Sequence, residues 1–505
     1  MLVERSKGKG SVLFGRLIFA ALAVFLTWAA AASIVDNHYG LDRLALLGST
    51  LAALAVFVFL WILIMRSEAF LERNSRLLTA LFLFFMGTCQ LIIIFPLRYT
   101  PVYDVEAVFS GAAEWAETGS FERYYDYYYM FFNNFGAMLL YRVVFGAARL
   151  AGIRDHYLVA SIFNGSLSLV SMYLTGSVLR RLTGVRGQFM AYCIFLCSLP
   201  FYFIAPAFYT DALSLVFPVL ILRLFLALMD EEKLWKRAIL YTLIGAASAI
   251  GYSVKATPVI MSAAVTVEAL INREWRKALA LGASSVLAVV MGLLLLRGIY
   301  YGHLDRETAL KRNIPVTHWI MMGLNTGTYN NEDYAFTKSF EDHGERDEAI
   351  KERIAELVRE KGLKGLFALF SKKLAVDYGD GTYGLSDCLG GPHGEDNFLH
   401  SFLLNGRSNN TTYRQITTGI LFAVYALVIA ECAAGALRGQ RGAGEAAPAL
   451  ALLGQILFLL IWEARWRYFS NFMPIFILTA VRSLDAANCI FCRNRFTILY
   501  HYDTM

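Results

Sequence analysis

Two short acidic motifs lie beside long apolar segments, and their carboxylates are the side chains in this sequence best suited to chemistry. Tyr103-Asp104-Val105-Glu106 follows one apolar segment, and Tyr209-Thr210-Asp211 follows another. An ionised carboxylate costs free energy near hydrocarbon, so a carboxylate at the end of a membrane span indicates a functional site. Either Asp104 or Asp211 can act as a general base on a hydroxyl group. The motifs indicate an enzyme that acts on a lipid-borne substrate at the membrane surface.

Helix capping is the structural alternative for both aspartates, because Asp is a common N-cap residue. Asp104 precedes the helical pattern Val108, Ala112, Trp115, and Asp211 precedes an apolar span that begins at Ala212. Glu106 lies two residues after Asp104 and points to a different helix face, which makes it the weaker candidate of the two.

Three cations are candidates for binding a lipid phosphate. Lys255 lies between two short apolar halves, and Arg465 and Arg467 follow Glu463 at the end of a later apolar segment. An Arg fork binds phosphate with two parallel hydrogen bonds, whereas Lys acts as a point charge. The alternatives are that these side chains are snorkelling anchors, or that the arginines neutralise Glu463.

Aromatic and amide side chains near these motifs are candidates for binding a sugar or an acceptor. Residues 121–135 are rich in Tyr and Phe and contain Asn133-Asn134. Tyrosine belts are common at membrane interfaces, but aromatic faces also stack on sugar rings and amides bond their hydroxyls. The Asp377–Tyr383 segment, by contrast, is typical of a Gly-rich turn. The candidates for sugar or acceptor binding are Tyr103, Glu106, Asn133, Asn134, Tyr209, His318, Trp319 and Glu463.

The composition places these residues in an integral membrane protein. Of 505 residues, 57% are hydrophobic and only 17% are charged, against about 25% charged in a soluble domain. The formal charge of +6 lies mainly in short loops, so it reports topology rather than nucleic-acid binding. No structural disulfide is expected. Cys489-x-x-Cys492 has no His or second cysteine pair nearby, and we expect no metal site.

The apolar segments predict an all-α polytopic protein with about 12 membrane helices. The segment 238–271 is too long for one helix and is predicted to form two, with Lys255 at the turn. If 134–152 is a helix that dips into or lies on the membrane, the basic loops and both termini fall on the cytoplasmic side. The acidic motifs and the cations then share the outer face. The predicted spans are 11–34, 43–65, 77–98, 158–179, 187–205, 212–229, two within 238–271, 278–299, 416–437, 447–462 and 471–484.

Three regions follow from this topology. Residues 1–299 form a transmembrane catalytic module that includes the outer loop 99–157. Residues 300–415 form an extracytoplasmic segment whose stretch 345–374 has apolar residues at helical spacing, which predicts an amphipathic helix on the bilayer or over the cavity. Residues 416–505 carry the last transmembrane helices and a short cytoplasmic tail.

The motifs and their order resemble the GT-C glycosyltransferases, which use polyprenyl-phosphate-linked sugars. The layout is similar to that of the protein O-mannosyltransferases and lipid A aminoarabinose transferases. It is also similar to that of a bacterial group that decorates cell-envelope polymers. The motifs that carry this resemblance are Asn-Asn, Tyr-Thr-Asp, Val-Lys-Ala-Thr-Pro, His-Trp-Ile-Met-Met-Gly and Glu-Ala-Arg-Trp-Arg-Tyr. The resemblance implies a GT-C bundle with juxtamembrane helices in the first large outer loop.

The resemblance also implies a reaction and its partners. Asp104 and Asp211 would be the catalytic carboxylates, and Lys255 with Arg465 or Arg467 would bind the lipid phosphate. The enzyme would invert the sugar as it moves from the polyprenyl-phosphate donor to a hydroxyl of a glycan, lipid or protein. No cofactor is required, and a divalent metal is not needed where cations bind the phosphate. The alternatives are a transporter or flippase, or a polymerase or ligase, of lipid-linked sugars.

Overall fold

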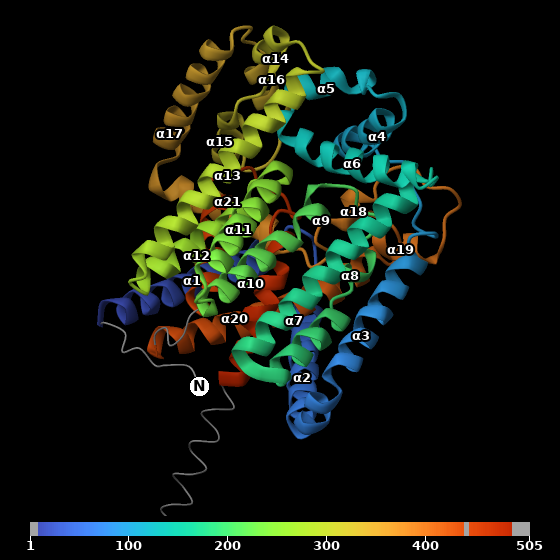
Figure 1. Cartoon of the computed structure of the whole chain (residues 1–505). Coiled ribbons are helices and arrows are strands. Elements are labelled where there is room, and N and C mark those ends of the chain that lie inside the picture. Colours follow the sequence, from blue (N-terminus) through green and yellow to red (C-terminus); the bar gives the residue numbers. More distant parts are fainter. Residues whose placement is uncertain (1–8, 439–443, 487–505) are drawn as a thin grey trace, which may run out of the picture.

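The computed structural model describes residues 9–438 and 444–486. Within these residues the regular structure is helical and no β-strand forms (Figure 1). Tyr99 and His393 make an isolated antiparallel bridge. The prediction of an all-α protein is confirmed. Cys489, Cys492, most of the basic loop 438–443 and both ends of the chain lie outside the described residues.

Eight helices of the described chain are long and apolar enough to cross a membrane. α7 is interrupted at Gly184, whose φ of 78° breaks it into two parts close to the two predicted spans 158–179 and 187–205. The eight are α1 (Lys9–Asp36), α2 (Arg43–Arg66), α3 (Glu68–Ile93), α7 (His156–Cys197), α9 with α10 (Thr210–Ser214 and Val216–Asp230), α11 (Leu234–Val254), α13 (Trp275–Tyr301) and α20 (Asn410–Arg438).

Shorter apolar helices complete the bundle. They are α12 (Val259–Ile271), α21 (Ala446–Ile461) and a helix at 473–486. Lys255 lies at the turn between α11 and α12, as predicted. The predicted loop 66–76 is instead almost wholly helical, because α3 begins at Glu68 and continues through arginines that favour helix.

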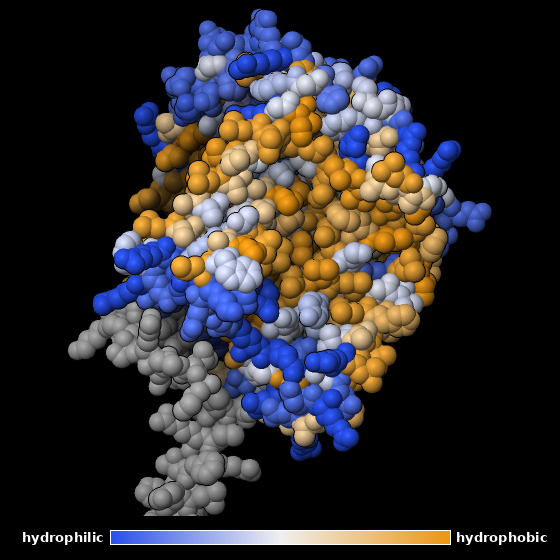
Figure 2. Space-filling model, in the orientation of Figure 1, coloured by the Kyte–Doolittle hydropathy of each residue, from blue (hydrophilic) through white to orange (hydrophobic). Residues whose placement is uncertain are grey.

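The surface agrees with a membrane protein. Figure 2 shows apolar residues across the middle of the visible face, with hydrophilic residues gathered toward two opposite ends. Leu287, Val290 and Leu294 on α13 are large apolar side chains that remain exposed. Such an exposed apolar face is what contact with lipid requires.

Short helices between α3 and α7 form one end of the molecule (Figure 1). They are α4 (Tyr103–Thr118), α5 (Tyr125–Met130) and α6 (Phe135–Leu150). α6 has 16 residues and is not among the helices long and apolar enough to cross a membrane; that the segment 134–152 dips into or lies on the membrane stays a prediction. It packs on α4 and meets α11, where a Cβ on Gly136 would lie 1.9 Å from the carbonyl oxygen of Ser253.

The segment 300–415 is helical and returns to the bundle. α17 breaks at Gly362, where φ is 55°. Before the break it buries Ile350 against α15, and after it Phe367 stacks on Trp28 of α1 with 4.8 Å between ring centroids. The predicted amphipathic helix is therefore present, in two parts. The helices are α14 (Arg306–Arg312), α15 (Val316–Asn325), α16 (Asn331–Lys338), α17 (His343–Tyr378), α18 (Leu385–Cys388) and α19 (Phe398–Leu403).

Candidate active site

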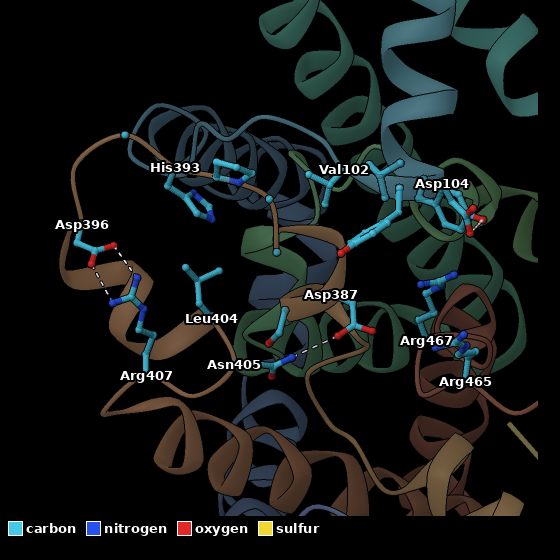
Figure 3. Close-up of a pocket in the computed structure, with 18 residues that line it drawn as sticks. Val102, Asp104, Asp387, His393, Asp396, Leu404, Asn405, Arg407, Arg465 and Arg467 are labelled. Carbon is cyan, nitrogen blue, oxygen red and sulfur yellow. Dashed lines mark hydrogen bonds and ion pairs between the residues drawn. The ribbon is translucent and has the colours of Figure 1, made fainter. Parts of the chain in front are cut away.

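A cavity of about 1070 Å³ opens beside α4, between the start of that helix and loops from the last quarter of the chain (Figure 3). Asp104 and Arg467 lie toward one end of the view, and His393 and Arg407 toward the other. No residue of α17 lines it, so α17 does not form its wall. The lining residues come from five parts of the chain: 102–105, Tyr209, residues between 386 and 396 (386, 387, 390–394 and 396), residues between 404 and 407 (404, 405 and 407), and Arg465 with Arg467.

Asp104 lies in the first turn of α4 and accepts hydrogen bonds from tyrosines. The Tyr127 hydroxyl donates to Oδ1 at 2.9 Å, and the Tyr209 hydroxyl lies 3.2 Å from Oδ2. Burial raises the pKa of both phenols well above the ordinary value, so both stay protonated as donors. Asn134 completes the group. Its side-chain amide donates to the Tyr127 hydroxyl, and its side-chain carbonyl oxygen lies 3.3 Å from the Tyr209 hydroxyl.

The helix-capping alternative fails for Asp104. The N-cap of α4 is Val102, and no side chain caps the helix. The carboxylate is therefore held by tyrosines in the cavity rather than by its own helix. Tyr103, the residue before it, has a φ of 55°, which is rare for a bulky residue, and its side chain is 88% exposed.

Asp211 is buried and shared by two cations. Lys255 pairs with Oδ1, and the Arg467 Nε lies 3.2 Å from Oδ2. The 3.2 Å contact lacks hydrogen-bond geometry, so it is an ion pair and leaves the Nε hydrogen free. The N-cap of the following helix α9 is Tyr209 and no side chain caps it, so the capping alternative fails here too. Burial lowers the pKa of Lys255, while Asp211 opposes that shift.

Arg467 joins the two carboxylate groups. Its guanidinium carbon lies 4.7 Å from the ring centroid of Tyr209, the same tyrosine whose hydroxyl reaches Asp104. Gly384 permits this placement. It has a φ of 68°, and a Cβ there would lie 2.7 Å from the Cβ of Arg467. Asp104, Tyr209, Arg467, Asp211 and Lys255 form one continuous group, which we name the acid–cation cluster.

Arg465 points to a different partner. Its Nε donates to Glu463 at 2.8 Å, as the neutralising alternative predicted, while its side chain also lines the cavity. Its backbone N–H donates to Oδ1 of Asp377 at 2.9 Å. Burial raises the pKa of Asp377 well above its ordinary range. Asp377 ends α17 and so is not part of a Gly-rich turn as predicted, whereas Asp380 is, since the Thr382 N–H donates to it.

Eight predicted site residues do not line the cavity. Asn134, Asp211 and Glu463 contact residues that do line it, and Lys255 pairs with Asp211. The other four have different partners. Glu106 is exposed and accepts from Tyr124, and Asn133 is exposed and donates to Asn134. His318 is buried in the outer helices against Thr337, and Trp319 stacks on Trp462. A mixture of apolar and polar residues occurs in packed helices as well as on binding surfaces. The pattern around His318 and Trp319 therefore gave a wrong prediction of a binding site.

Other residues at the cavity carried no clear signal in the sequence. Tyr127 contacts Asp104 without lining the cavity, and it was one of many aromatic residues in its run. Asp387 lies in the short helix α18, and Asn405 and Arg407 lie in a polar loop, and their sequence resembles ordinary connections. Within the described residues, no group of three or more His, Cys, Asp or Glu could hold a metal ion. That no metal is needed stays a prediction.

The fold and the acid–cation cluster define a polytopic membrane protein with a polar cavity at one end. The chain belongs to the family described as conserved hypothetical integral membrane protein, whose model matches residues 10–488. The comparison with curated proteins found no significant match.

A solved structure is similar to this chain. It is the crystal structure of ArnT from Cupriavidus metallidurans bound to undecaprenyl phosphate, with 11% identity over 81% of this chain and 78% of that chain, and a TM-score of 0.36. ArnT is a GT-C glycosyltransferase, the class that the sequence motifs resemble.

Proposed function

We propose that this protein is an inverting glycosyltransferase that moves a sugar from a polyprenyl-phosphate carrier to a hydroxyl acceptor on a glycan, lipid or protein. The observation that carries the proposal is that a carboxylate, Asp104, and a cation, Arg467, face one cavity and contact the same tyrosine, Tyr209. A transfer of this kind needs a base for the hydroxyl and a positive charge for the phosphate, and the cluster offers both.

The chemistry is a single displacement at the anomeric carbon. Asp104 takes the proton of the acceptor hydroxyl while the acceptor oxygen forms its bond to that carbon. The bond to the phosphate oxygen breaks, its electron pair leaves with the polyprenyl phosphate, and the anomeric centre inverts. Tyr127 orients the Asp104 carboxylate through its hydrogen bond.

Apart from Asp104, the proposed base, the charges of the acid–cation cluster suit a phosphate. Lys255 and Arg467 together carry two positive charges, and Asp211 supplies one negative charge between them. One positive charge is left over beside the cavity, in a site shielded from water where it acts strongly on a developing anion. Asp211 is better suited to holding these cations than to taking the proton, so Asp104 is the proposed base.

The enzyme would lie in the cell membrane because its donor does. With both termini cytoplasmic, the acid–cation cluster and the cavity would lie at the extracytoplasmic face, where a lipid-linked donor and a cell-envelope acceptor meet. We expect no divalent metal requirement, since cationic side chains serve the phosphate.

The test uses purified protein in nanodiscs with polyprenyl-phosphate glycosides of several sugars as donors. Release of free polyprenyl phosphate and formation of a glycosylated product are measured by mass spectrometry. We expect Asp104→Asn to lower turnover at least a hundredfold while donor binding persists. Glu106→Gln is the matched control, because it removes a carboxylate two residues away on the same helix but outside the cavity.

A transporter of lipid-linked sugars gives a different result. It would move the intact donor between leaflets without releasing polyprenyl phosphate, and Asp104→Asn would not separate binding from turnover. Intact donor after prolonged incubation with every sugar and with envelope extracts as acceptor would overturn the proposal.

A further inference from the structure

The cavity extends beyond the acid–cation cluster. Its volume of about 1070 Å³ is at the upper limit of the range of about 300–1,000 Å³ typical of a site for one small molecule. A second set of polar side chains lines it from Asp387, in the middle of the view, to Arg407, at the end opposite Arg467 (Figure 3). The set is Asp387, His393, Asp396, Asn405 and Arg407.

Asp387 presents a carboxylate oxygen without a partner to this end of the cavity. Its Oδ1 accepts from the amide of Asn405 at 3.3 Å, and within the described part of the chain no group hydrogen-bonds to Oδ2. The side chain is only partly buried and lines the cavity. It is therefore an open acceptor for a hydroxyl group or another donor of a ligand.

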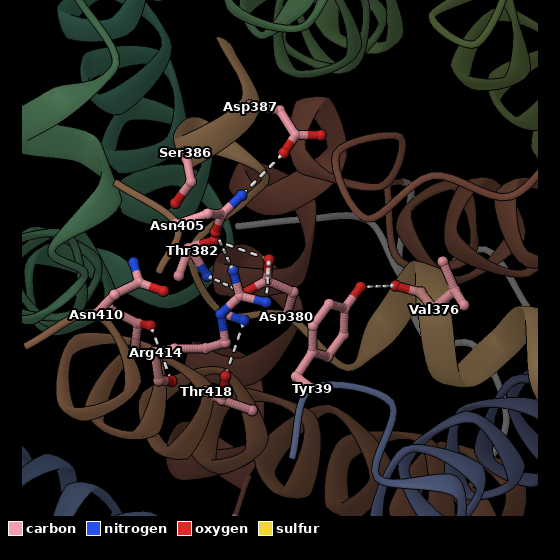
Figure 4. A network of polar contacts seen from close by, with 12 residues as sticks. Tyr39, Val376, Asp380, Thr382, Ser386, Asp387, Asn405, Asn410, Arg414 and Thr418 are labelled. Atoms are coloured by element: carbon pink, nitrogen blue, oxygen red, sulfur yellow. Dashed lines mark hydrogen bonds and ion pairs between the residues drawn. The ribbon is translucent and has the colours of Figure 1, made fainter. Parts of the chain in front are cut away.

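A polar network fixes the direction of the Asn405 amide (Figure 4). Arg414 donates to the Asn405 carbonyl oxygen at 3.0 Å, so the NH₂ group must face Asp387. Arg414 is itself held by Asp380 at 3.8 Å and lies over the ring of Tyr39, with 4.7 Å from its guanidinium carbon to the centroid. Asn405 is exposed, so the network orients Asp387 through one hydrogen bond at the surface of the cavity.

Tyr103 adds an aromatic face to the same cavity. It lines the cavity with 88% of its surface exposed, in a left-handed backbone conformation that costs free energy for a bulky residue. A strained backbone that holds an aromatic ring in the open is typical of a ligand platform. Tyrosine rings stack on the apolar face of a sugar, while carboxylates and amides bond its hydroxyls.

The charges at this part of the cavity do not select an anion. Arg407 pairs with Asp396 at 2.8 Å and Arg465 pairs with Glu463, so both charges are already matched. Asp387 brings a negative charge, on which Arg467 and Arg465 act from the side of the acid–cation cluster. A phosphate or carboxylate beside Asp387 would meet that negative charge, whereas a neutral ligand rich in hydroxyl groups would not.

We infer that the part of the cavity lined by Tyr103, Asp387 and Asn405, next to Asp104, binds the acceptor, and that the acceptor is a neutral carbohydrate. The role as acceptor rests on the proposed function, whereas carbohydrate binding does not. Asp387 accepts from a sugar hydroxyl and Tyr103 stacks on the ring. Arg414 acts only through Asn405 and is a positioning residue.

The test is binding of the full-length protein, in phospholipid nanodiscs free of glucoside or maltoside detergent, to an array of neutral, acidic and amino glycans. We expect binding to neutral glycans, and at least a tenfold loss of affinity in Asp387→Asn and in Tyr103→Ala. Glu395→Gln is the matched control, since Glu395 is exposed on the same loop and does not line the cavity. Absence of binding to neutral glycans, or binding unaffected by Asp387→Asn, overturns the inference.

Arg414→Lys and the catalytic variant separate the roles. With the bound glycan as acceptor, Arg414→Lys should raise its KM severalfold and leave the KM of the donor and kcat unchanged, which a general loss of structure would not do. Asp104→Asn should bind the glycan normally and lose transfer. If the wild type bound glycan but transferred no sugar to it, the proposed function would be rejected and the carbohydrate site would stand. If Asp387→Asn transferred sugar as well as the wild type, the carbohydrate site would be rejected and the proposed function would stand.

Discussion

The guanidinium of Arg467 packs on the ring of Tyr209, and this contact links the proposed base, Asp104, to the proposed phosphate site. The guanidinium of Arg467 lies over the Tyr209 ring at 4.7 Å, and the hydroxyl on that ring lies 3.2 Å from Asp104. The two residues are 258 positions apart in the chain. The ring face of Tyr209 thus contacts a cation, and its hydroxyl contacts a carboxylate. Removing the hydroxyl oxygen would therefore separate the proposed effect on the base from the proposed effect on phosphate binding.

Tyr209→Phe removes that oxygen and keeps the ring under Arg467. A hydrogen bond to a charged group contributes about 1.5–3 kcal/mol, so we expect kcat to fall about tenfold or more. Donor affinity should change little because the aromatic face is retained. Tyr202→Phe, which removes a hydroxyl bonded to the Leu196 carbonyl away from the cavity, is the control. Weaker donor binding with unchanged kcat would show that Tyr209 acts on the phosphate rather than on Asp104.

Asp211→Asn leaves Lys255 and Arg467 together without their shared carboxylate. Removing one partner of a buried ion pair costs about 3–5 kcal/mol, so the apparent Tm in nanodiscs should fall. Added polyprenyl phosphate should then raise the Tm of the variant more than that of the wild type, because a bound anion restores the lost charge.

The control for this comparison is Asp230→Asn. Asp230 pairs with Arg181 but its side chain is 56% exposed, and an exposed pair contributes at most about 1 kcal/mol. Its Tm should barely change with or without ligand. An equal gain from ligand in Asp211→Asn and the wild type would argue against phosphate binding at Lys255 and Arg467.

Charged residues beside apolar segments were the sequence signal that predicted most of the candidate site. Placing a charge near hydrocarbon costs free energy, and four of the residues singled out on this ground lie in the acid–cation cluster: Asp104, Asp211, Lys255 and Arg467. The all-helical fold and the turn at Lys255 followed from the length of the apolar segments. The outer segments carried less information, because residues such as Asp387 in the short helix α18 and Asn405 in a loop come to the cavity only when distant segments pack together.

Lys373 shows the same limit within a helix. It lies in an amphipathic pattern where lysines are expected to face water, yet it is 1% exposed and donates to two backbone carbonyls. Its neighbour Lys372 is exposed as the pattern predicts. The spacing of apolar residues predicts which face of α17 is apolar. It cannot show that the ends of α15 and α21 cover Lys373 on the polar face.

His318 makes stability depend on pH. Burial lowers its pKa from the ordinary 6.5 to about 4, so the folded protein holds it neutral while the unfolded chain takes up a proton below pH 6.5. The free energy of unfolding therefore has its full value, as far as His318 is concerned, above pH 6.5. It falls as the pH drops toward 4, by at most about 3 kcal/mol.

The measurement compares the Tm at pH 7.5 and pH 5 in the wild type and in His318→Asn, whose amide keeps a polar group near Thr337. We expect a smaller fall on acidification in the variant. His343→Asn, at the less buried start of α17, should fall as the wild type does. A fall in His318→Asn as large as in the wild type would assign the acid sensitivity to other groups.

Lys373 and Asp377 hold the loop that carries Arg465 and Arg467. The Lys373 ammonium donates to the carbonyls of Gly323 at 3.0 Å and Leu460 at 2.5 Å, and Asp377 accepts from the Arg465 N–H at 2.9 Å. Lys373→Met keeps the side-chain length but leaves two buried carbonyls without a donor, at about 1–3 kcal/mol each. We expect a lower Tm and, because the end of α21 loosens, weaker donor binding.

Lys372→Met makes the same chemical change one residue away on the exposed face, and it should alter neither quantity. Asp377→Asn keeps an oxygen for the Arg465 N–H and should preserve donor affinity, whereas Asp377→Ala should reduce it. If Lys373→Met were no less stable than Lys372→Met, the anchoring role would be excluded. If Asp377→Ala bound donor as well as Asp377→Asn, Arg467 would owe its position to Asp211 and Tyr209 alone.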